Sequence, residues 1–253
     1  MAEGDTILRA ARRIEQAVGG EELAVAAPNP RGQAAGVPRL DCREITAVRT
    51  HGKHLICEFG DLALHTHLGM SGSWHIYPVG VRWRKPKYLA WVVLGGERHE
   101  AVQFNGPTVR VLRTRLLARD PKLKALGPDI LAPELDIAGV VARLRRTRHD
   151  RGLGDALLDQ NLVAGIGNIF KSEGCWRAAL DPWRPLSDLT DEDLKLAVSA
   201  SRGLMVAAVA EGRAPKKVYR RAGQPCRRCR RQLRSLGQGD ANRTTYWCPN
   251  CQE

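Results

Sequence analysis

The first twenty residues show the hydrophobic spacing of a helix. Apolar side chains recur every three or four positions at Ile7, Ala11, Ile14 and Val18, and arginines lie between them. Asp5 can cap the start of this helix, and the glycine pair at 19–20 can end it. The pattern predicts an amphipathic helix with one face on a core.

From residue 23 to residue 113 the hydrophobic period changes to two. Gly52-Lys53 and Gly60-Asp61 are typical of hairpin turns. No helical pattern separates the runs, which predicts an antiparallel sheet folded into a sandwich behind the first helix. The predicted strands are Ile45–Thr50, His54–Phe59, Leu62–His67, Tyr88–Leu94 and His99–Gln103.

The second half of the chain returns to helical spacing. A helix is expected near Asp136–Leu144, and a long one begins at Thr190 and ends at Gly212. Between them, the apolar run from residue 157 breaks at Gly165 and Gly167, which predicts helix, tight turn and helix, with Asn168 as the cap. On this turn alone, two interpretations stay open: a plain helical hairpin, or a phosphate seat at a helix N-terminus. The fold class is α+β.

Four of the seven cysteines cluster near the C-terminus. Cys226-x2-Cys229 and Cys248-x2-Cys251 enclose 18 residues (248 − 229 − 1), which is the spacing of a four-thiolate zinc site on a β-hairpin. Two disulfides are the alternative, and the scattered remaining cysteines argue against it. Because four thiolates leave no position for water, we expect one structural Zn²⁺ ion that does not catalyse.

The charge of the chain indicates a polyanionic partner. The formal net charge is +13 and the pI is near 9.9. Residues 213–235 hold ten basic side chains and no acidic one, which predicts a phosphate-facing surface. Charges interrupt every apolar stretch, and the first five residues are not those of a secretion signal. We expect no membrane contact and a cytoplasmic, nucleoid-associated protein.

Four motifs in the right order resemble the formamidopyrimidine-DNA glycosylase and endonuclease VIII family of base-excision repair enzymes. The resemblance covers essentially the whole chain and is nearest to actinobacterial endonuclease VIII-like proteins. The motifs are residues 2–6 (Ala-Glu-Gly-Asp-Thr), residues 52–55 with 67–72 (Gly-Lys-His-Leu and His-Leu-Gly-Met-Ser-Gly), residues 160–173, and residues 243–251.

The resemblance implies a fold and an activity. It implies an N-terminal β-sandwich catalytic domain (1–120), a linker (121–135), a helix-two-turn-helix domain (136–215) and a zinc finger (216–253). A monomer would bind damaged double-stranded DNA and flip the damaged nucleotide out of the duplex. In the family, the N-terminal amine exposed by Met1 removal attacks C1′, expels the base and nicks the strand through a Schiff base by β,δ-elimination.

Residue roles follow from the same resemblance. The nucleophilic amine would belong to Ala2, and Glu3 matches the acidic partner that moves protons. The phosphate-gripping residues match Lys53, Asn168 and Arg243, and Met70 matches the residue that fills the vacated stack. The zinc ligands would be Cys226, Cys229, Cys248 and Cys251.

Two departures from the family shape the expected specificity. Ala2 replaces the usual proline, so a DNA-lesion binder with lost or altered catalysis is the alternative function. Residues 102–107 do not reproduce the Arg and Phe that assist the methionine in the oxidised-purine branch. Oxidised pyrimidines and abasic sites are therefore the expected substrates.

Overall fold

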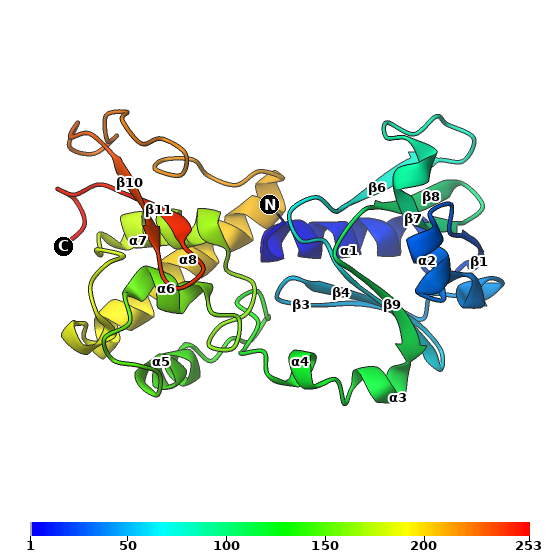
Figure 1. The fold of residues 1–253 in the computed structure, drawn as a ribbon, viewed down its shortest axis with the longest axis horizontal. Coiled ribbons are helices and arrows are strands. Elements are labelled where there is room, and N and C mark those ends of the chain that lie inside the picture. Colours follow the sequence, from blue (N-terminus) through cyan, green and yellow to red (C-terminus); the bar gives the residue numbers. More distant parts are fainter. Residues whose placement is uncertain (1) are drawn as a thin grey trace. The chain divides into compact units, whose positions relative to one another are not determined.

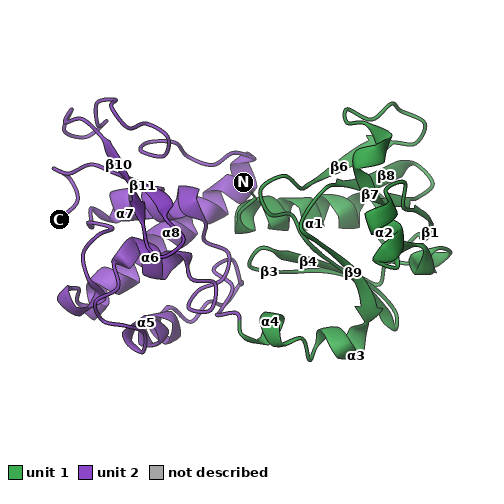
Figure 2. Ribbon diagram, viewed as in Figure 1, with its two compact units in different colours: residues 1–125 green, residues 126–253 purple. Residues whose placement is uncertain are grey.

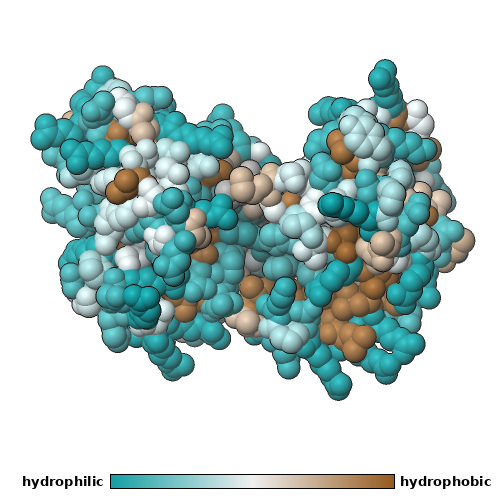
Figure 3. All heavy atoms as spheres, viewed as in Figure 1, coloured by the Kyte–Doolittle hydropathy of each residue, from teal (hydrophilic) through white to brown (hydrophobic). Residues whose placement is uncertain are grey.

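The computed structural model describes residues 2–253, which form two compact units (Figures 1 and 2). Unit 1 extends to Ala125 and unit 2 runs from Leu126 to Glu253. Among the described residues, no helix is long and apolar enough to cross a membrane. Hydrophilic residues cover most of the face seen in Figure 3, and in unit 1 hydrophobic ones gather near α3 (Thr114–Leu117), where Leu116 is exposed.

Unit 1 is a sandwich of two antiparallel sheets with a helix on its core. One sheet has the order β2-β1-β7-β8-β6 and the other β3-β4-β5-β9. Helix α1 (Gly4–Val18) buries Ile7, Ile14 and Val18 in a core shared with both sheets. The strands are β1 (Glu22–Ala26), β2 (Arg43–Glu44), β3 (Ala47–His51), β4 (His54–Phe59), β5 (Leu62–His67), β6 (Ser73–Pro78), β7 (Ala90–Gly95), β8 (His99–Phe104) and β9 (Thr108–Arg113).

The expected sandwich is confirmed, and both predicted hairpin turns join paired strands. The start of β7 was predicted too early, because Lys87–Leu89 forms a 3-10 turn (η2) after Pro86. Strands β1, β2, β6 and β9 were not predicted. Short helical turns complete the unit: α2 (Pro30–Ala34), η1 (Val37–Leu40), α3 and α4 (Pro121–Lys124).

The predicted cap of α1 was wrong. The N-cap is Glu3, and Asp5 lies inside the first turn, where its carboxylate contacts Arg9 at 3.2 Å. Burial raises the pKa of Asp5, which only the nearby hydrogen bonds and Arg9 oppose. Asp5 therefore belongs to the buried side of α1 rather than to its end.

Unit 2 is a helical bundle extended by a hairpin. Its helices are α5 (Ile137–Arg145), α6 (Leu153–Leu158), α7 (Asn168–Ala178), η3 (Leu186–Asp188) and α8 (Asp191–Glu211), and its hairpin is β10 (Arg234–Gln238) with β11 (Arg243–Trp247). Helix α7 packs along α8, and their shared core includes Phe170, Leu194 and Met205.

The ends of α8 are those expected. Thr190 and Asp193 form a reciprocal capping box, and Gly212 ends the helix in the left-handed region. The predicted cap of α7 was wrong: Gly167 is the N-cap, and Asn168 is the first helical residue. The connection from α6 to α7 is also longer than a tight turn, since it runs from residue 159 to residue 167.

Candidate functional site

Ala2 and Glu3 lead directly into α1 in unit 1. Ala2 is half-buried against the sandwich core, and Glu3 is only 1% exposed. The backbone carbonyl of Glu3 accepts the N–H groups of Thr6 and Ile7, which starts the helix. The residue that directly follows Ala2 in the chain is therefore a buried glutamate.

Lys53 lies on the turn between β3 and β4. Helix α1 packs against both strands, and Figure 1 shows this turn near the start of the helix. His67, at the end of β5, is opposite His54 across the ladder. Burial, and then the positive charge of Lys53, lowers the pKa of His67.

Met70 projects from a closed loop between β5 and β6. The N–H of Gly72 donates to the carbonyl of Leu68 at 2.8 Å, and the N–H of Gly69 donates to Nδ1 of His67 at 3.2 Å. Gly69 has φ +58° and lies against the Pro107 ring, so a side chain there would be strained and crowded. This braced loop holds the Met70 side chain 71% exposed.

The loop from β8 to β9 has no aromatic or cationic side chain that could act beside Met70. Phe104 is fully buried, where Trp83 and His75 contact its ring. Gln103 is also fully buried, and its Nε2 donates to the carbonyl of Asn105. Gln103 and Phe104, the last two residues of β8 before this loop, are therefore buried and cannot assist Met70.

In unit 2, Gln160 braces the loop that leads into α7. Its Nε2 donates to the carbonyls of Leu158 and Ile166, and its Oε1 accepts the N–H of Gly165 at 3.0 Å. Gly165 has φ +106°, a conformation that favours glycine. One side chain thus fixes the path of the chain up to the first turn of α7.

Asn168 joins α7 to the C-terminal hairpin. Its Nδ2 donates to the carbonyl of Thr244 at 2.7 Å, next to Arg243 in β11. The side chain is 7% exposed, and its Oδ1 has no hydrogen-bond partner among the described residues. The Thr244 carbonyl requires a donor, which sets the orientation of the amide.

A second bond chain ties the same hairpin to α7 through a buried lysine. Lys171 is fully buried, and its Nζ donates to Oγ1 of Thr245 at 2.6 Å. Thr245 donates in turn to Oε1 of Gln238, and Nε2 of Gln238 donates to the carbonyl of Pro182. Both strands of the hairpin are therefore fastened to the helical bundle.

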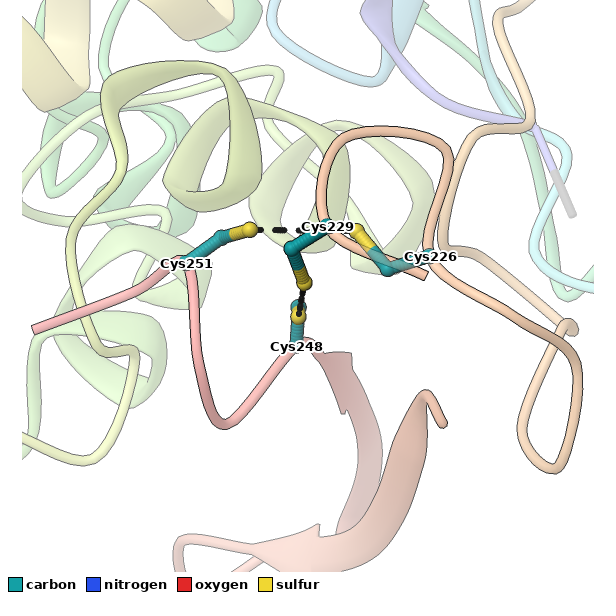
Figure 4. A group of neighbouring side chains, drawn as sticks. All are labelled: Cys226, Cys229, Cys248 and Cys251. Atoms are coloured by element: carbon teal, nitrogen blue, oxygen red, sulfur yellow. Dashed lines mark hydrogen bonds between the residues drawn. The ribbon is translucent and has the colours of Figure 1, made fainter. Parts of the chain in front are cut away.

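The four C-terminal cysteines converge on one point (Figure 4). Their sulfurs all lie within 4.8 Å of one another, with Cys229 to Cys248 at 3.5 Å and Cys226 to Cys251 at 3.9 Å. These distances exclude disulfides, and four sulfurs about 2.3 Å from a tetrahedral Zn²⁺ would be about 3.8 Å apart. The predicted structural zinc site and its four ligands are confirmed.

The basic segment before the zinc site is anchored by Glu173 of α7. This carboxylate, 1% exposed, accepts the backbone N–H groups of Lys217, Val218 and Tyr219 at 2.8 to 3.0 Å. Arg228 also faces the bundle: its guanidinium lies 4.0 Å from the Trp176 ring centroid and donates to two carbonyls of α7. The expected phosphate-facing surface therefore excludes Arg228.

The site residues expected from the sequence fall into two groups. Ala2, Glu3, Lys53 and Met70 lie in unit 1, and Asn168, Arg243 and the zinc ligands lie in unit 2. Lys171, Glu173 and Thr245 were not expected to fasten the hairpin and the basic segment. The available signal was the presence of two charged residues, Lys171 and Glu173, in a predicted core helix, because charged residues are rarely buried unless they are paired.

Comparisons with known proteins cover the whole chain. Three family models match in order: the formamidopyrimidine-DNA glycosylase N-terminal domain (residues 1–116), the formamidopyrimidine-DNA glycosylase H2TH domain (126–219), and a zinc finger found in FPG and IleRS (223–253). The resemblance inferred from the motifs is confirmed.

Relatives and solved structures agree with these models. A probable endonuclease 8 2 of Streptomyces coelicolor is 37% identical over 100% of this chain and 94% of that protein. The DNA-(apurinic or apyrimidinic site) lyase Nei2 of Mycolicibacterium smegmatis is 31% identical over 100% of this chain and 99% of that protein. Lactococcus lactis Fpg, solved with DNA containing an abasic site, has the same fold, with a TM-score of 0.85 at 22% identity over 100% of both chains.

Proposed function

Because the chain belongs to the formamidopyrimidine-DNA glycosylase and endonuclease VIII family, we propose that it is a bifunctional DNA glycosylase and abasic-site lyase whose nucleophile is the amine of Ala2. The observation that carries the proposal is that Glu3, the residue directly after Ala2 in the chain, is buried. An acid in that position can protonate a departing base and take protons back during elimination. The zinc ion takes no part, because its four thiolates complete its coordination.

The reaction begins when Met1 has been removed and the Ala2 amine is unprotonated. Its lone pair forms the N–C1′ bond, the C1′–base bond breaks with its electrons, and Glu3 assists the proton transfers. The C1′–O4′ bond then breaks as O4′ takes up a proton and the nitrogen loses one, which opens the sugar and gives the Schiff base. Loss of a C2′ proton expels the 3′-phosphate, loss of the C4′ proton expels the 5′-phosphate, and water hydrolyses the remaining imine to release Ala2. Alanine gives a neutral imine where proline gives a permanent cation, so the site must keep the imine protonated.

We assign DNA contacts to residues of both units. Lys53 and Arg243 supply cations for phosphates, Asn168 supplies its remaining amide hydrogen, and Met70 enters the gap left by the flipped nucleotide. The exposure of Met70 on a braced loop supports its role.

Oxidised pyrimidines and abasic sites are the proposed substrates. The inward-facing Phe104 and Gln103 support this choice, since the loop offers no aromatic or arginine wedge of its own. A duplex series with one oxidised thymine, one oxidised guanine or one abasic site tests it, and preferential excision of the oxidised guanine would contradict it.

Borohydride trapping on abasic DNA tests the nucleophile. We expect a covalent adduct that peptide mapping places on the amine of Ala2, and Glu3→Gln should slow base excision more than it slows trapping on a preformed abasic site. Ala2→Leu is the matched control, because a large second residue should retain Met1 and abolish the adduct at residue 2. A wild-type protein that loses Met1 and gives no adduct would remove the lyase assignment and leave a lesion-binding protein.

A further inference from the structure

The outer face of the β3-β4-β5-β9 sheet carries histidines on neighbouring strands. Across the ladders, His51 is opposite His54, His54 is opposite His67, and His65 is opposite Arg110. His54 directly follows Lys53, and its ring lies 4.8 Å from that of His67 and 5.1 Å from that of His65. This histidine cluster therefore adjoins the proposed phosphate-binding lysine.

A directed chain of hydrogen bonds runs into His54. Nη2 of Arg110 donates to Oδ2 of Asp120 at 2.7 Å and to Nδ1 of His65 at 2.8 Å. Nε2 of His65 is 2.9 Å from Nδ1 of His54. Asp120 is itself held, because its other oxygen accepts two backbone N–H groups at the start of α4.

The chemistry of arginine fixes the tautomers in this chain. A guanidinium can only donate, so Nδ1 of His65 is an acceptor and its proton is on Nε2. Nε2 of His65 then donates, so Nδ1 of His54 is an acceptor as well, and the proton of His54 is on Nε2. Both rings are neutral, and His54 keeps Nε2–H as its remaining donor.

The surroundings of the two rings agree with neutrality. Burial, together with His67, His65, His51 and Arg110, lowers the pKa of His54 to about 3. Burial and the Arg110 charge lower the pKa of His65 to about 4, against the opposite effect of Asp120. A neutral N–H donor is therefore maintained throughout the physiological pH range.

We propose that His54 is a further phosphate-binding residue of the DNA interface, with His65, Arg110 and Asp120 as the positioning residues that fix its Nε2–H tautomer. The inference rests on the proposed function, because it takes DNA as the ligand and Lys53 as a neighbouring contact. A lysine gives a phosphate a mobile charge, whereas a ring held between β3 and β5 gives it a directional donor.

His54→Phe and His54→Ala test the donor. Both should weaken binding of uncleavable abasic-analogue DNA about fivefold, the effect of one neutral hydrogen bond, with no change in salt slope. Lys53→Ala, by contrast, should lower that slope by about 0.9. Phenylalanine keeps the ring packing, so wild-type affinity in His54→Phe would overturn the proposal, and a melting curve verifies that each variant is folded.

The positioning chain has a readout that packing alone would not change. Imidazole ¹⁵N shifts should show Nδ1 bare and Nε2 protonated in both His54 and His65. In Arg110→Met, Nδ1 of His65 loses its donor and can take up a proton. The DNA affinity of Arg110→Met, divided by that of the double variant Arg110→Met/His54→Phe, should therefore depend on pH below about pH 6.5. Arg110→Lys should restore a flat ratio, and Arg113→Met, on the same strand, is the charge-matched control.

The two proposals fail separately. A wild-type protein that binds DNA in a His54-dependent way but gives no borohydride adduct would overturn only the lyase function. An Nδ1–H tautomer at His54 would overturn the inference about His54 even where trapping succeeds. The same holds if the DNA affinity of the wild-type protein, divided by that of His54→Phe, titrates near pH 6.5.

Discussion

The β-sandwich and the zinc-bound tail differ in what holds each of them in place. The sandwich core buries side chains from α1 and from both of its sheets. From residue 213 onward, by contrast, the buried hydrophobic residues are few, and two of them are zinc ligands: Val218, Tyr219, Cys226, Leu233 and Cys248. A tail with so little apolar burial depends on its metal and on its bonds to α7.

This difference changes how each region would present a DNA-binding residue. Lys53 stands on a turn between two paired strands, and its backbone is determined by the sheet. Arg243 opens the second strand of a hairpin, next to its turn. The position of this hairpin depends on zinc, on the bond from Lys171 to Thr245, and on the bond from Asn168 to Thr244. Damage to these fastenings should therefore affect Arg243 and leave Lys53 in place.

Loss of zinc should produce the largest effect. Binding of Zn²⁺ supplies about 10 kcal/mol to modules of this size, so Cys248→Ala should disorder the tail and abolish DNA binding while the sandwich stays folded. Metal content, DNA affinity and amide exchange resolved by segment would measure this. Cys42→Ala, at an exposed cysteine of unit 1, is the control. Normal affinity in Cys248→Ala would show that the tail does not depend on its metal.

Glu173→Gln should give the next largest effect. The glutamine amide keeps one acceptor oxygen but turns its NH₂ group toward backbone N–H groups that bind the carboxylate in the wild-type protein. This should lower the stability of the segment by about 2 to 3 kcal/mol. Faster amide exchange at residues 217–219, with zinc content unchanged, is the expected result. Glu192→Gln, an exposed pair partner of Lys195 on α8, should leave this exchange as it is.

The sequence predicted most of what depends on local pattern. The strands from His54 to Phe59 and from Leu62 to His67 have the expected bounds, because alternation and glycine turns determine both. The sandwich class, the capping box and the zinc ligands were also predicted from local sequence patterns. Strand β9 alternates as clearly, with Val109 and Val111 buried, and was missed although its signal was present.

The remaining features depend on contacts between distant parts of the chain. Asn168 has the composition of a helix cap, but the Thr244 carbonyl takes its amide, and the cap position is Gly167. The tautomer of His54 depends on Arg110 and Asp120, which are far from it in sequence. Hydrophobic periodicity carries no information about such partners, so no reading of the pattern could have supplied them.

Acid should weaken the sandwich through two of its histidines. The folded-state pKa values of His54 and His65, about 3 and 4, lie below the unfolded value of about 6.5. Their contribution to stability is therefore complete above pH 6.5 and is lost as the pH falls toward the folded-state values. Amide exchange in β4 and β5 should accelerate over that window. His54→Phe should flatten the response, and His149→Phe in unit 2 should not.

The smallest effect should separate Arg243 from Asn168. Arg243→Ala removes one proposed cation–phosphate contact, so the slope of log affinity against log salt should fall by about 0.9. Asn168→Ala removes a neutral amide, so affinity should fall severalfold with that slope unchanged. Because Asn168 also holds the Thr244 carbonyl, its variant should in addition accelerate exchange in β11, which Arg243→Ala should not do. An unchanged affinity in Arg243→Ala would remove the hairpin from the interface, and a changed slope in Asn168→Ala would mean that loosening the hairpin displaces Arg243 itself.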